Sequence, residues 1–157
     1  MTEEFLHYIW QYRLYNPHLV LQSGEEVEVL HPGMHNSDSG PDFFNAKIRI
    51  GDTIWAGNIE IHILSSDWNR HNHQHDMSYD NVILHVVWRD DSEILRNDKT
   101  PIPTLELDGL YNENAWKNYL GFMNSRQWIP CYKMISSIDP FIRNAWFDRV
   151  LVERLER

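Results

Sequence analysis

The chain has 157 residues, of which 42% are hydrophobic and 13% aromatic, a size and composition that suit one compact domain with a substantial core. Its formal net charge of −9 at pH 7 excludes a protein whose whole surface binds nucleic acid, because such a surface would be repelled by a polyanion at long range. The sequence has no apolar run of membrane-span length, no basic signal-peptide start and a single cysteine, Cys131, so we expect a cytoplasmic protein without a membrane partner or an intrachain disulfide.

The first predicted element is a helix from Glu3 to about Tyr15. Thr2 can cap it, and apolar residues recur along it at helical spacing: Phe5, Leu6, Ile9, Trp10 and Leu14. The Asn16-Pro17 pair ends the helix. A short alternating strand is predicted at 27–30, and the residues from His31 to Pro41, rich in structure breakers, predict a surface loop.

Two strands that form an antiparallel hairpin are predicted next. From Asp42 onward, apolar residues share one parity, which predicts a strand with one buried face: Phe44, Ala46, Ile48 and Ile50. Gly51-Asp52 is a plausible tight turn into a second strand at 53–64. In that second strand Glu60 and His62 share one face, so two ionisable groups stand side by side on a strand otherwise suited to burial.

The remaining elements follow the hairpin. Residues 67 to about 77 predict a short helix, the apolar run 82–88 predicts a central strand buried on both faces, and 102–107 predicts an edge strand. The residues after this edge strand are predicted to be mainly helical, with an irregular patch around Trp128-Ile129-Pro130. The last of these helices begins at Asp139-Pro140, is amphipathic and runs to Arg157 without a cap.

The predicted order is helix, strand, strand, strand, helix, strand. This order indicates an α/β protein with a mixed central sheet flanked by helices. We expect residues 1–110 to form this core and residues 111–157 to form a helical C-terminal segment. We also expect that segment to continue into a region absent from this chain, and its last helix to mediate association.

Pro41-Asp42, followed on the next strand by Glu60-Ile61-His62, resembles the PD-(D/E)xK phosphodiesterase superfamily, which includes restriction endonucleases and many repair nucleases. The predicted element order is similar to the core of that superfamily. The segments GPDFFNAKIRI, GNIEIHILSSDW and NVILHVVW also resemble an uncharacterised family of bacterial proteins. The first resemblance implies a restriction-endonuclease-like core and a nuclease or phosphodiesterase, with nucleic acid as a possible partner.

The superfamily resemblance also implies roles for individual residues. Asp42 and Glu60 would bind Mg2+ or Mn2+, with the carbonyl of Ile61 as a third ligand. His62 stands where the superfamily has lysine. It could orient the attacking water, donate to a phosphate oxygen or bind the metal, and the replacement could also mark a loss of activity.

A structural explanation stays open for each of these residues. Asp42 after Pro41 could stabilise a turn. Glu60 could form an ion pair across the hairpin with Lys47 or Arg49, because a buried carboxylate needs a partner. His62 could serve as the hydrogen-bond partner of Glu60.

A second cluster of histidines and acids follows the hairpin: Asp67, His71, His73, His75, Asp76 and His85. On a helix, residues 67, 71 and 75 would share a face, a spacing compatible with Zn2+, although an exposed polar face also explains it. Two alternatives to the nuclease therefore remain. One is a histidine-rich zinc-type hydrolase using His71, His75 and His85, and the other is a noncatalytic interaction domain. Glu28 and the loop residues 35–38 are further candidates for the site.

Overall fold

The computed structural model describes residues 1–126, 129 and 132–156. The predicted patch around Trp128 and Pro130, the lone Cys131 and the terminal Arg157 lie outside the described residues. Contacts within the chain divide it into two compact units, Met1–Lys117 and Asn118–Arg157.

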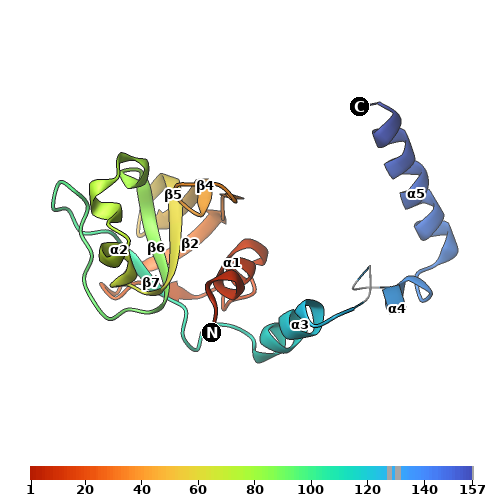
Figure 1. The fold of residues 1–157 in the computed structure, drawn as a ribbon, viewed down its shortest axis with the longest axis horizontal. Helices are drawn as coiled ribbons and strands as arrows, with labels where there is room; N and C mark the ends of the chain where they lie inside the picture. The colour runs from red at the N-terminus through yellow and green to blue at the C-terminus, as the bar shows by residue number, and fades with distance from the viewer. Residues whose placement is uncertain (127–128, 130–131, 157) are drawn as a thin grey trace. The chain divides into compact units, whose positions relative to one another are not determined.

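A mixed sheet of seven strands forms the first unit (Figure 1). The order along the sheet is β1-β2-β4-β5-β6-β7, and β3 pairs with β4. Pairs from β1 to β5 are antiparallel, whereas β6 is parallel to β5 and β7 is parallel to β6. The predicted mixed α/β class with a sheet core flanked by helices is therefore confirmed. The strands are β1 (Leu19–Val20), β2 (Glu26–His31), β3 (Met34–His35), β4 (Phe43–Ile50), β5 (Thr53–Leu64), β6 (Val82–Arg89) and β7 (Thr104–Glu106).

The helix α1 (Glu3–Tyr12) buries one apolar face: Phe5, Leu6, Ile9 and Trp10. It ends before the predicted Tyr15, because Arg13 adopts a left-handed conformation with φ of 53° and its N–H bonds back to Trp10. The Arg13 guanidinium then donates to the carbonyl of Leu30 at 2.9 Å, which ties the helix end to β2. The loop predicted after β2 contains the two-residue strand β3.

The antiparallel hairpin of β4 and β5 is confirmed, with Ile50 opposite Thr53 at its turn. The alternation predicted for the start of β4 is wrong, because Phe43 is buried and Phe44 is half-buried. Asn45 has a φ of 57°, and the register shifts between Phe43 and Ala46. This bulge adds a residue to β4 and turns Phe43, the neighbour of Asp42, into the core.

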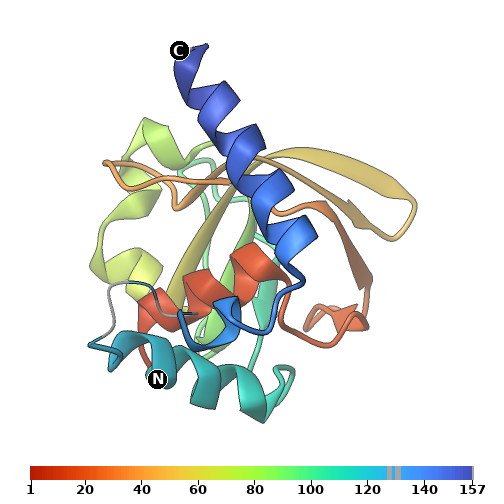
Figure 2. The same cartoon turned by 90° about the vertical axis from the view of Figure 1, so that its right-hand side faces the viewer.

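Strand β6 is buried from Val82 to Val87, as its apolar run predicted. The crossover from β5 to β6 consists of α2 (Asp67–Arg70) and two single 3₁₀ turns, η1 (His73–His75) and η2 (Met77–Tyr79). The continuous helix predicted from Asp67 to Met77 is wrong, because Asn72 adopts a left-handed φ of 60° and breaks it. Figures 1 and 2 show α1 and this crossover on opposite sides of β5 and β6.

The C-terminal part is helical, as predicted. Its helices are α3 (Glu113–Met123), α4 (Tyr132–Ile135) and α5 (Pro140–Leu155). The side chain of Asp139 caps α5 by accepting a hydrogen bond from the N–H of Phe141 at 2.8 Å. Trp146 and Phe147 of α5 are exposed, whereas Trp10 is fully buried. Among the described residues, no helix combines the length and apolar character needed to cross a membrane.

Candidate metal centre

Asp42 and Glu60 lie next to each other where β4 begins beside β5. The N–H of Ile61 donates to Oδ2 of Asp42 at 2.8 Å, and the N–H of Asp42 donates to Oε2 of Glu60 at 3.2 Å. Each carboxylate is therefore oriented by the backbone of the strand opposite. The loop that leads into Asp42 is also held in place, because the Asn36 side-chain amide donates to the carbonyls of Asp38, Ser39 and Pro41.

Glu60 is a buried acid surrounded by imidazoles, with 4% of its surface exposed. Its Oε1 lies 3.3 Å from Nε2 of His73 and 3.5 Å from Nε2 of His62. Burial, followed by the negative charge of Asp42, raises the pKa of Glu60 to about 9. At neutral pH the carboxyl therefore holds its proton unless a cation displaces it.

The predicted ion pair of Glu60 with Lys47 or Arg49 is wrong. Arg49 instead forms an ion pair with Glu28 on β2. Glu28, which the sequence suggested as a further acid of the site, is therefore paired with Arg49. Lys47 is exposed. Across the residues that the structure describes, the ion pairs of Glu60 are with histidines alone.

His62 is 1% exposed and has imidazole neighbours on both ring nitrogens. Its Nδ1 lies 2.8 Å from Nε2 of His85, and its Nε2 lies 3.1 Å from Nδ1 of His71. Burial, followed by the nearby charges of His73 and His71, lowers the pKa of His62 to about 3. Burial likewise lowers the pKa of His85. His62 and His85 are therefore neutral at pH 7, the form in which imidazole offers a lone pair.

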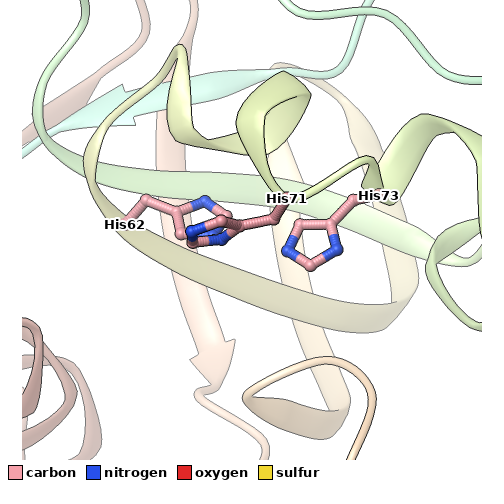
Figure 3. A group of neighbouring side chains, drawn as sticks. All are labelled: His62, His71 and His73. Carbon is pink, nitrogen blue, oxygen red and sulfur yellow. The ribbon is translucent and has the colours of Figure 1, made fainter.

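His71 and His73 converge on His62 from the crossover (Figure 3). Each of the three residues offers one ring nitrogen, and these nitrogens lie within 4.8 Å of one another. The predicted helix face with His71 and His75 does not exist, and His75 is exposed at the end of η1 outside this group. His73 belonged to the histidine-rich stretch noted in the sequence, but no spacing rule singled it out.

Two residues of α1 that the sequence analysis missed complete the surroundings of Asp42. Ligand atoms of Glu3, His7 and Asp42 lie within 4.8 Å of one another, and Nε2 of His7 is 3.3 Å from Oδ2 of Asp42. Burial lowers the pKa of His7, but the contact with Asp42 and the charge of that carboxylate outweigh it, so the pKa is raised. The four-residue spacing of Glu3 and His7 placed both on one helix face and was the available signal.

The loop before Asp42 also reaches this region. The ring of His35 lies 5.4 Å from that of His7 and 5.2 Å from that of Phe43. Carboxylate oxygens and imidazole nitrogens therefore gather around Asp42 and the strand β5. Both are metal-ligand groups, the first preferred by Mg2+ and Mn2+ and the second by Zn2+ and similar ions.

Fold and site together define a mixed α/β protein with a buried cluster of acids and histidines on its sheet. Residues 3–157 match the family described as Protein of unknown function (DUF2851), and the chain belongs to that family. No curated protein and no solved structure matches the chain. The family description names no activity, so the site itself carries the functional argument.

Proposed function

We propose that this protein is a divalent-metal-dependent phosphodiesterase or nuclease with a restriction-endonuclease-like core. The observation that carries the proposal is the pair of hydrogen bonds that holds the two acids together: the N–H of Asp42 donates to Glu60, and the N–H of Ile61, the residue after Glu60, donates to Asp42. Glu60 is buried with no lysine or arginine beside it among the described residues, so its ionised form needs a cation. The element order also supports the proposal: after α1 come five antiparallel strands, of which β2, β4 and β5 are longer than two residues, then a crossover and the parallel strand β6.

Asp42, Glu60 and the carbonyl of Ile61 would hold Mg2+ or Mn2+. In an antiparallel ladder the N–H and C=O of one residue face the same neighbouring strand, so the Ile61 carbonyl is expected on the side of Asp42 that its N–H contacts. Such a cation would supply the Lewis acidity that phosphodiester hydrolysis requires. Cation binding would also release the proton that burial holds on Glu60.

His62 takes the place that lysine has in the resembled superfamily, with different chemistry. A lysine ammonium can only donate hydrogen bonds, whereas a neutral imidazole can both donate and accept. Because the pKa of His62 is lowered to about 3, its ring adds no positive charge beside Glu60 at neutral pH. We therefore assign His62 a positioning role toward Glu60, its neighbour at 3.5 Å.

The proposal is tested by cleavage assays on single- and double-stranded DNA and RNA, and on a small phosphodiester, with Mg2+ or Mn2+. We expect Asp42→Asn and Glu60→Gln each to lower kcat/KM by about 100-fold or more, because each removes a charged ligand worth several kcal/mol in the transition state. Glu28→Gln is the matched control, since Glu28 pairs with Arg49 on the other strand. Thermal melts check that each variant folds.

Undiminished cleavage in both site variants would remove the proposed site. No cleavage of any substrate by the wild-type protein would instead favour the noncatalytic interaction domain. In that case the acids at 42 and 60 serve the structure, and neither substitution changes any binding that the protein shows.

A further inference from the structure

The geometry points to a second metal site, for a transition metal such as Zn2+, made of Nε2 of His62, Nδ1 of His71, Nε2 of His73 and Oε1 of Glu60. This site differs from the carboxylate site proposed above in three of its four ligands. It rests on the arrangement of the side chains and does not depend on phosphodiesterase activity.

Several of the distances among the four ligand atoms are close to those around a tetrahedral ion. Three of them are 3.1 Å for His62–His71, 3.3 Å for His73–Glu60 and 3.5 Å for His62–Glu60. Metal–ligand bonds of about 2.0–2.1 Å at tetrahedral angles place ligand atoms roughly 3.3 Å apart. One ring nitrogen from each of the three histidines also lies within 4.8 Å of the nitrogens of the other two. The three histidines are therefore gathered for one ion, and Glu60, which lies outside that common limit, must shift to join them as the fourth ligand.

The backbone and the aromatic neighbours hold the histidines in this arrangement. Asn72, with its left-handed φ of 60°, separates His71 from His73 and lets both rings turn toward β5 (Figure 3). The ring of His73 stacks on Tyr79 with centroids 3.8 Å apart, and Trp68 packs edge-on against it at 5.4 Å. The crossover thus presents two preorganised ligands to His62.

His85 supplies the outer contact that a ligating histidine needs. If Nε2 of His62 binds the ion, its Nδ1 carries the proton and donates to Nε2 of His85 at 2.8 Å. This hydrogen bond fixes the tautomer and the ring orientation, as carbonyl and carboxylate acceptors do in other metal sites. His85 lies directly beside Glu60 in the parallel pairing of β5 and β6, so the contact is built into the sheet.

A buried polar atom without a hydrogen bond independently points to a ligand. Nε2 of His73 is buried and makes no hydrogen bond to the described residues, although Oε1 of Glu60 is close by. An unsatisfied buried polar atom costs on the order of 1–3 kcal/mol, so such atoms call for a partner. A cation between His73 and Glu60 would satisfy both groups.

Three imidazoles and one carboxylate favour Zn2+, Co2+ or Ni2+ over Mg2+. Glu60 faces Asp42 with Oε2 and the histidines with Oε1, which places its carboxylate between the two proposed sites. One acid can therefore serve two cations of different character.

The test uses the full chain without a histidine tag, freed of metal by chelator and titrated with Co2+ and then Zn2+. We expect one Co2+ to bind with the visible absorption bands of tetrahedral coordination, and Zn2+ to displace it. His71→Ala and His73→Ala should each weaken Co2+ binding by about 100-fold, at or beyond the upper end of the 10- to 100-fold loss typical of outer-shell changes. His71 is exposed, so its substitution does not threaten folding.

His75→Ala is the matched control, because His75 lies on the same crossover, is exposed and is outside the group. It should bind Co2+ like the wild type. Asp42→Asn should retain tetrahedral Co2+ while losing Mn2+-dependent cleavage, so failure of this site is distinguishable from failure of the proposed function. Absence of tetrahedral Co2+ binding, or equal losses in His71→Ala and His75→Ala, would overturn the proposal.

Discussion

Glu60 is the residue on which both proposed sites depend. It is buried between the N–H of Asp42 and two imidazoles, and burial with the charge of Asp42 outweighs that N–H and the charge of His7, which favour its ionised form. Its pKa of about 9 means that the metal-free protein keeps a neutral carboxyl at this position. A cation reverses this preference, because a positive charge in a buried site favours the carboxylate.

The pKa of Glu60 predicts how the stability of chelator-treated protein depends on pH. In the unfolded chain Glu60 loses its proton near 4.5, whereas in the folded protein it keeps the proton up to about 9. Between these values the folded state binds the extra proton, so the free energy of unfolding falls as pH rises, by at most about 1.4 kcal/mol per unit. His7, whose pKa is raised, contributes in the same direction just above 6.5.

His62 has the opposite effect at lower pH. Its pKa falls from 6.5 to about 3 on folding, so the unfolded state binds the extra proton and stability rises with pH up to 6.5. Above pH 6.5 His62 no longer contributes, and His7 is present in both the wild type and Glu60→Gln, so the difference between their slopes from pH 6.5 to 9 reports Glu60. We expect urea denaturation to show falling stability across this window in the wild type and a flatter profile in Glu60→Gln. Equal slopes for the two proteins would show that Glu60 is ionised without metal.

The candidate site was only partly predictable at the residue scale. Asp42 and Glu60 followed from a motif resemblance, and His62 from its position two residues along an alternating strand. Glu3 and His7 were not predicted, and His73 was named only as a member of the histidine-rich stretch, because the approach of all three to the site depends on tertiary packing. The left-handed Asn72 redirects the crossover, and α1 brings its face to Asp42; neither feature follows from a local pattern of apolar residues.

At the scale of elements, alternation and apolar runs predicted the hairpin and the buried strand β6, since these patterns report burial directly. The wrong predictions of secondary structure occur where a single residue adopts a positive φ. Asn45 creates the bulge in β4, and Asn72 divides the predicted helix into short turns. Asparagine tolerates this conformation better than most residues, but the sequence does not say which asparagine adopts it.

Gly57 lies where β5 comes so close to the start of β6 and the residue before it that a larger side chain would clash. A Cβ at this position would lie 2.4 Å from Cγ2 of Ile83 and 2.6 Å from the carbonyl oxygen of Asn81. We expect Gly57→Ala to lower the free energy of unfolding by about 1–3 kcal/mol, because the parallel pairing begins at the next residue, Asn58. Urea denaturation measures the loss.

Gly121→Ala is the control, because it makes the same substitution at a position with room for the added methyl group. Gly121 lies within α3, and a Cβ there meets no atom within 4 Å. Alanine should therefore raise helix stability by about 0.5–1 kcal/mol. A Gly57→Ala protein as stable as the wild type would mean that β5 and β6 can separate without cost.

At the scale of the whole molecule, the net charge of −9 opposes the approach of any polyanion. Repulsion between a negative protein and a long nucleic acid acts through solvent and is screened by salt. A small phosphodiester carries a single negative charge and experiences far less of it. Ionic strength can therefore distinguish the two classes of substrate.

We expect kcat/KM for a long nucleic acid to increase as monovalent salt rises from 0.01 to 0.15 M at fixed Mn2+, because the screening length shrinks from about 30 to about 8 Å. Initial rates on a small phosphodiester should change little over the same range. A steep loss of kcat/KM with salt would be the behaviour of a protein that binds phosphates through lysine and arginine. That outcome would show that a local basic surface outweighs the overall negative charge when substrate binds.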